Sequence, residues 1–173
     1  MILDKMLNEL LETAPVTNTC YENVKDILNF IIVSSDDDAI INNDKIYNEL
    51  NLTETNIEQS LHSCSAKMYF YSYKETVCNS YIELLDMLLD VRESVFMEKF
   101  RSENPKNAFK EKEADIKRSL MLDWEYKFYK VLHTSVKVIK SYYSPIVRAY
   151  DAQSRLLMAV NKRDMFKGEG GMN

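Results

Sequence analysis

The longest regular pattern of apolar positions in this sequence runs from Thr53 to about Ser102. Read in heptads, its a and d positions are apolar or cysteine except Glu75 and Arg92, and no Pro or Gly interrupts it before Pro105. Such a stripe predicts one long helix of coiled-coil character, which must bury the stripe against a second helix or another copy of itself. The a and d positions are Ile57, Leu61, Cys64, Met68, Tyr71, Glu75, Cys78, Ile82, Leu85, Leu89, Arg92 and Phe96.

A second long helix is predicted after the break at Pro105. It covers Asn107 to Tyr143, and the bend allows it to fold back antiparallel on the first helix. Beyond it, Ser144 and Pro145 either begin a third helix or kink one continuous helix. Its apolar positions are Ile116, Leu120, Trp124, Phe128, Val131, Val138 and Tyr142, with Leu132 and Ile139 adjacent.

Shorter amphipathic segments predict three further helices, at Ile2 to Glu12, Cys20 to Ser34 and Lys45 to Leu50. The fold class that follows is all-α: an elongated antiparallel hairpin of long helices with coiled-coil character, plus short N-terminal helices. No apolar run approaches the length of about 20 residues that a membrane-spanning helix needs. No signal peptide is recognised at the start of the sequence.

Charge is divided unevenly along the chain, whose net charge is −5. Residues 1–91 hold 5 basic and 16 acidic residues, hence −11, and residues 92–173 hold 17 and 11, hence +6. Either the C-terminal half binds a polyanion, or the two halves neutralise each other in an oligomer. We expect residues 1–50 to form an acidic helical extension and residues 168–173 a flexible tail. Residues 51–167 are expected to form one domain, a hairpin of long helices that oligomerises and binds single-stranded DNA.

Basic and aromatic residues gather around the predicted bend, where Phe96, Phe100 and Phe109 alternate with cations. Cations suit the phosphates of a single strand and Phe rings suit its bases, so this is the candidate nucleic-acid site. A solvated loop and a contact with an acidic partner remain alternatives. The cations are Arg92, Lys99, Arg101, Lys106, Lys110 and Lys112, and a second basic stripe consists of Arg148, Arg155 and Lys162.

The sequence contains no recognisable catalytic constellation. His62 and His133 have no partners at zinc-ligand spacing, and there is no Gly-rich phosphate loop or nucleophile elbow. We therefore expect no enzymatic activity, no metal and no cofactor. Cys20, Cys64 and Cys78 are predicted to be buried thiols of a protein in a reducing cytoplasm.

Three segments carry a resemblance to a known family. They are Leu52 to Tyr73, Tyr-rich from Lys67 onward; the basic-aromatic segment Val95 to Ser102; and Glu113 to Asp123, with its acidic-x-acidic-hydrophobic-Lys pattern. Together they resemble the UvsY-type recombination mediators of tailed bacteriophages, over about residues 51–168. Ser154-Arg155 and Phe166-Lys167-Gly168 are also similar.

The resemblance implies a helical protein without enzymatic activity that assembles into a ring-like homo-oligomer. Such a mediator binds single-stranded DNA, loads a recombinase and helps to remove the single-strand-binding protein, in recombination, repair and replication. It would act in the cytoplasm of the host if a phage encodes it. The resemblance places Lys99 and Arg101 in the family's DNA-binding stretch.

Two other classes of protein are consistent with the same residues. A helical adaptor or inhibitor would bind a partner helix and use its acidic N-terminal half, including Asp36, Asp37 and Asp38, to mimic nucleic acid. A structural coiled-coil protein would oligomerise without any ligand. Neither alternative predicts affinity for a single strand.

Overall fold

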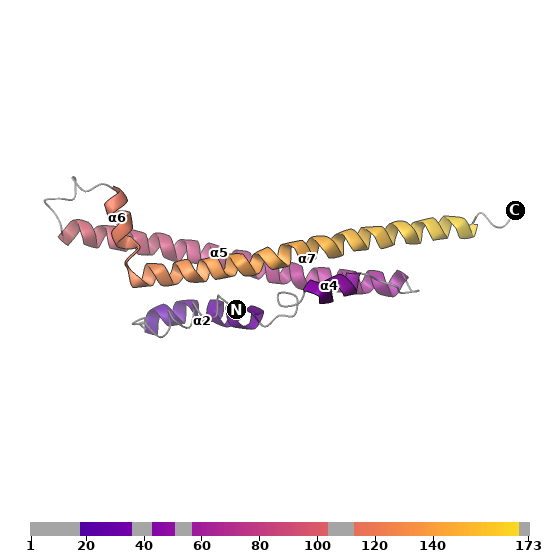
Figure 1. Ribbon diagram of the computed structural model, residues 1–173, viewed down its shortest axis with the longest axis horizontal. Coiled ribbons are helices and arrows are strands. Elements are labelled where there is room, and N and C mark those ends of the chain that lie inside the picture. The colour runs from indigo at the N-terminus through magenta and orange to yellow at the C-terminus, as the bar shows by residue number, and fades with distance from the viewer. Residues whose placement is uncertain (1–17, 36–42, 51–56, 104–112, 170–173) are drawn as a thin grey trace. The chain divides into compact units, whose positions relative to one another are not determined.

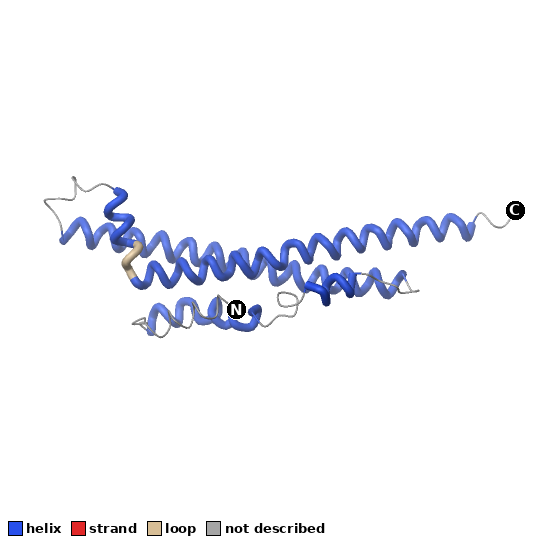
Figure 2. The backbone as a smooth tube through the Cα atoms, viewed as in Figure 1, coloured by secondary structure: helices blue, strands red, loops and turns tan. Residues whose placement is uncertain are grey.

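The computed structural model describes residues 18–35, 43–50, 57–103 and 113–169, and these residues are helical except for one turn at 121–123 (Figures 1 and 2). The predicted all-α class is thereby confirmed. The predicted helix at Ile2 to Glu12 and the predicted bend at Pro105 lie outside the described residues. The helices are α2 (Asn18–Ser35), α4 (Asn43–Leu50), α5 (Ile57–Glu103), α6 (Glu113–Leu120) and α7 (Trp124–Glu169).

The chain forms two compact units, and both long helices contribute a segment to each. Unit 1 contains residues 1–35 and 79–138, and unit 2 contains residues 36–78 and 139–173. Within each unit, later residues of α5 pair with earlier residues of α7, so the two helices form an antiparallel hairpin (Figure 1).

The predicted heptad stripe of α5 is the buried side of that helix. Every a and d position from Ile57 to Phe96 is buried or half-buried. Leu85 and Cys78 are fully enclosed, with 0% of their surface exposed. The stripe is therefore covered by helices of the same chain, which removes the need for another copy to bury it. Burial raises the pKa of the Cys78 thiol to about 12, with a further contribution from Glu75, so this thiol is a packing group.

In unit 2, the interior is built around aromatic stacking. The rings of Tyr71 and Tyr150 are parallel within 8° at a centroid distance of 6.1 Å, and Tyr143 lies 6.0 Å from Tyr71. Lys74 lies over the Tyr143 ring and Lys67 over the Tyr150 ring, so both lysines add cation–π contacts. Helix α4 is held on this interior by Ile46, which packs with Cys64, Ile146 and Tyr150.

In unit 1, α2 buries one face in agreement with its predicted pattern. Its buried residues Val24, Ile27, Leu28 and Ile31 recur at helical spacing. The Phe30 ring packs edge-on against Tyr81 of α5, with a centroid distance of 5.3 Å. The helix predicted for Cys20 to Ser34 is confirmed, as is the one predicted for Lys45 to Leu50.

The region after the predicted bend differs from expectation in three ways. The chain turns after α6, at 121–123, so the helix predicted for Asn107 to Tyr143 is wrong as a single element. Helix α7 then continues through Pro145, so the alternative of one continuous helix holds and a third helix is excluded. Within this helix Tyr143 is fully buried while Tyr142 is 36% exposed, so the predicted apolar set was wrong at that position.

Packing explains why α7 tolerates Pro145. A proline inside a helix removes one hydrogen bond and costs about 3 kcal/mol. Tyr143 and Ile146 are buried on either side of it, and the Ser144 hydroxyl donates a hydrogen bond to Glu75 of α5. These contacts within unit 2 offset the lost backbone hydrogen bond.

Leu84 and Leu85, which are adjacent on α5, allow a test of which side of the helix is buried. Leu85→Ala empties an enclosed site and should lower the free energy of unfolding by about 2–5 kcal/mol. Leu84→Ala is the matched control, because Leu84 is 39% exposed and its replacement should cost less than about 1 kcal/mol. Urea unfolding measures both, and equal losses would contradict this assignment of the buried side.

Candidate nucleic-acid interface

The structure describes six of the nine predicted nucleic-acid contacts. Arg92, Lys99 and Arg101 lie on the last part of α5 in unit 1, whereas Lys106, Lys110 and Lys112 lie outside the described residues. Lys99 and Arg101 are exposed, and Lys99 lies 3.9 Å from Glu103 in a solvated ion pair.

Arg92 has a different environment, because it is held by carboxylates. Its Nε and Nη2 donate hydrogen bonds of 2.8 and 2.7 Å to the two oxygens of Asp123, and its Nη1 lies 2.8 Å from Glu125. The hydrogen bond from Arg92, aided by backbone N–H groups, lowers the pKa of Asp123. With its guanidinium forked onto Asp123, Arg92 links α5 to the start of α7 within unit 1.

Asp123 also determines where α7 begins. Its Oδ1 accepts a 2.9 Å hydrogen bond from the N–H of Tyr126, the position that an N-cap carboxylate satisfies. Immediately before it, the N–H groups of Leu122 and Asp123 bond the carbonyls three residues earlier, which closes the end of α6. Asp123 therefore combines a cap and an ion pair, and this explains the turn that apolar periodicity missed.

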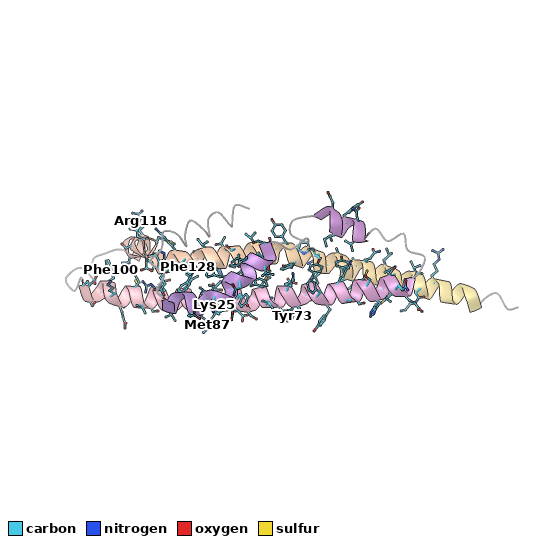
Figure 3. The ribbon with its side chains drawn as sticks, turned by 90° about the horizontal axis from the view of Figure 1, so that it is seen from below. Lys25, Tyr73, Met87, Phe100, Arg118 and Phe128 are labelled. Atoms are coloured by element: carbon cyan, nitrogen blue, oxygen red, sulfur yellow. The ribbon has the colours of Figure 1, made fainter. Side chains whose placement is uncertain are left out.

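Next to this ion pair lies a pocket of about 240 Å³. Its apolar wall consists of Val95, Phe96 and Phe100, and the two Phe rings are 23° from parallel with centroids 6.4 Å apart. Figure 3 shows Phe100 near the end of α5. The pocket lining is Arg92, Val95, Phe96, Lys99, Phe100, Glu103 and Asp123.

The second predicted stripe lies on α7 within unit 2. Arg148, Arg155 and Lys162 are exposed and recur every seven residues, which places them on one side of the helix. Asp151 pairs with Arg155 at 2.8 Å. Among the side chains that the structure describes, no carboxylate pairs with Arg148 or Lys162.

Sequence reasoning missed two further surface features, both in unit 1. Lys127, Lys130 and Lys137 are exposed on α7, and the signal was available: residues 126–163 hold eight Lys and Arg but one acidic residue, Asp151. The second feature is an exposed apolar stripe on α5, in which Met87 is 66% exposed (Figure 3). This stripe consists of Leu84, Met87, Val91 and Val95.

The described residues contain no group of three or more side chains suited to hold a metal ion. His133 is buried with its Nε2 3.0 Å from Oδ1 of Asp86, and burial, together with nearby Lys137, lowers its pKa. It packs at the interface between α5 and α7 within unit 1. None of the described helices is both long and apolar enough to cross a membrane.

No protein-family model matches this sequence, and neither curated proteins nor solved structures yielded a match. The resemblance to UvsY-type mediators therefore stays a prediction.

The Arg92 ion pair makes a pH-dependent prediction. Arg92→Gln should lower the free energy of unfolding by about 1–3 kcal/mol at neutral pH, because charged hydrogen bonds to Asp123 are lost. Since the pKa of Asp123 is lowered in the folded state, this contribution is complete above the ordinary aspartate pKa of about 3.9. It should disappear as the pH falls below that value and Asp123 is protonated.

Urea unfolding of wild type and variant across an acid pH series measures this effect. Lys99→Gln is the control, because the exposed Lys99–Glu103 pair should contribute less than about 1 kcal/mol. A loss in Arg92→Gln that stays constant from neutral to acid pH would show that the ion pair is not its cause.

Proposed function

We propose that this protein binds single-stranded DNA and acts as a recombination mediator, helping to load a recombinase in place of single-strand-binding protein. The observation that carries the proposal is the stripe of exposed cations on α7: Arg148, Arg155 and Lys162. With a rise of about 1.5 Å per residue, consecutive members of the stripe are roughly 10 Å apart along the helix. A flexible strand can follow such a row of cations with its phosphates.

Charge distribution on α7 supports this ligand over a generic solvated helix. A helix kept soluble by charge alone carries acidic and basic residues mixed along its surface. Residues 126–163 of α7 instead hold eight Lys and Arg and one acidic residue, Asp151, which forms an exposed ion pair with Arg155 of the stripe. Contacts of this kind neutralise phosphates without reading bases, so we expect binding to every sequence.

The mediator role and the partners rest on the resemblance. Its layout of a long helix, a basic-aromatic exit and a segment ending at Asp123 supports a homo-oligomer that works beside a recombinase and a single-strand-binding protein. The proposed DNA contacts are Lys99 and Arg101 in unit 1 and the α7 stripe in unit 2. Arg92 is left out of the proposed contact set, because its guanidinium is bound to Asp123 and Glu125.

A second candidate function, a protein–protein adaptor, is favoured by the exposed apolar stripe of α5. Leu84, Met87, Val91 and Val95 are flanked by the carboxylates of Glu83, Asp86, Asp90 and Glu98. An open groove of about 850 Å³ runs along part of this face, lined by Asp90, Val91, Val95 and Glu98 among others. The chemistry fits an amphipathic helix with a basic polar face. The heptad stripe itself is covered by α7, so this outer stripe is the surface that a partner helix would use.

The DNA proposal predicts a charge-dependent loss of affinity. Replacing Arg148, Arg155 and Lys162 together by Ala should weaken binding of oligo-dT and mixed-sequence strands equally. It should also reduce the slope of log affinity against log salt by about 3, or about 1 for each phosphate contact. Fluorescence anisotropy in a salt series measures both quantities.

Lys25→Ala controls for the general loss of positive charge, because Lys25 is an exposed cation on α2. It should leave affinity and slope nearly unchanged. Wild-type protein that ignores oligo-dT even at low salt would overturn the DNA proposal, and a triple variant with the wild-type slope would remove the stripe from the site.

The adaptor proposal predicts that Met87→Glu abolishes binding of a Leu/Lys amphipathic helical peptide. A charged side chain in the middle of the apolar stripe opposes burial of the peptide's leucines. Tyr73→Glu is the matched control on the same helix, since Tyr73 is 63% exposed and outside the stripe (Figure 3). Isothermal titration calorimetry measures the affinity of the wild type and both variants for this peptide and for its Leu/Glu counterpart. Equal affinity for the two peptides would count against an acidic docking face.

A further inference from the structure

The pocket beside Phe96 and Phe100 has the dimensions and lining of a site for one flat ring. At about 240 Å³ it is smaller than the roughly 300–1,000 Å³ of pockets that take drug-sized ligands. Its wall is mainly apolar, with two nearly parallel aromatic rings from successive turns of α5. Its occupant should therefore be a single planar ring system.

Charge around the pocket narrows the class of ligand. Lys99 lines it and is exposed, and the exposed Arg101, two residues later, lines the neighbouring groove, which shares Val95 with this pocket. Two carboxylates also line the pocket, and each has a cation beside it: Arg92 is forked onto Asp123, and the exposed Lys99 lies 3.9 Å from Glu103. A planar ring that carries an anionic group outside the pocket fits this arrangement.

We propose that this pocket receives one unstacked nucleobase of a bound single strand, which packs against Phe96 and Phe100 while Lys99 and Arg101 bind the adjoining phosphates. The inference rests on the proposed DNA binding and deepens it. In this proposal the end of α5 in unit 1 contacts both a base and phosphates, whereas the stripe of α7 contacts phosphates only. Because every base has an aromatic face, the pocket accepts any base and adds affinity without sequence preference.

A ligand with phosphates but no bases provides the test. Affinity of the full-length protein is measured by anisotropy for labelled oligo-dT and for a strand of equal length built of tetrahydrofuran abasic units. Stacking of one base in the pocket should favour oligo-dT by about fivefold to a hundredfold. Phe100→Leu keeps the apolar bulk but removes the aromatic face, so this preference should fall towards one, with affinity for the abasic strand unchanged.

Two further variants test whether the base binds in this pocket and not at another aromatic residue. Val95→Trp should fill the pocket and so also abolish the preference for oligo-dT over the abasic strand. Unlike Phe100→Leu, it adds side-chain volume, so a cavity cannot be the cause of its effect. Tyr73→Leu replaces an exposed aromatic residue elsewhere on α5 and should retain the wild-type preference. Circular dichroism and urea unfolding identify any variant that fails to fold, and the conclusion is then taken from the other pocket variant.

Each outcome decides one proposal or the other. Equal wild-type affinity for both strands would overturn the pocket and leave phosphate binding intact. A preference that persists in Phe100→Leu and Val95→Trp would place the base contact elsewhere and also overturn the pocket. Failure of the wild type to bind either strand at low salt would overturn the proposed function itself.

Discussion

Burial of one heptad stripe is the constraint on which the rest of this structure depends. A helix as long as α5 cannot leave its a and d side chains in water, so a second helix of similar length must lie along them. Helix α7 meets this need in both units, and its own buried set includes Phe128, Leu132, Val136 and Ile139. Apolar burial has no direction, however, and does not by itself fix how the helices are aligned.

Alignment is supplied by the two charged positions of the stripe. Glu75 accepts a hydrogen bond from Ser144 in unit 2, and Arg92 is forked onto Asp123 in unit 1. Each polar group would be left without its partner on a half-buried surface if α7 slipped by one turn. The interruptions of the apolar pattern therefore give the hairpin a unique register, as single polar residues do in coiled coils.

Much of the fold could be predicted from the sequence because it follows from periodicity. The stripe of α5, the pattern of α2 and the existence of a hairpin each depend on the spacing of apolar residues, which is local information. The turn at 121–123 could not be found in this way. Helix α7 begins at this turn because the Asp123 carboxylate binds both a backbone N–H of α7 and a guanidinium from a different helix. That partner is specified only by the tertiary structure.

In the candidate site, too, features that follow from local periodicity could be predicted and features that depend on tertiary partners could not. Exposure of Arg148, Arg155 and Lys162 follows from their place opposite a predictable apolar face. Arg92 was also predicted as a nucleic-acid contact, with the cations of the bend, yet it lies on the buried side of α5 and its partners come from a segment about thirty residues later. Sequence position on the stripe already distinguished the two cases, since an a or d cation faces the partner helix. Sequence position alone could not identify Asp123 and Glu125 as the carboxylates that bind Arg92.

Segregation of charge follows from the hairpin as well. Of the acidic residues in the first half of the chain, those on the outer face of α5 surround the apolar residues Met87 and Val91, while the exposed side of α7 is basic. Acidic side chains on this face of α5 repel polyanions, whereas the exposed basic side chains of α7 attract them. The carboxylates of α5 thereby restrict where a polyanion can lie. They favour ligands of opposite charge on that face of α5.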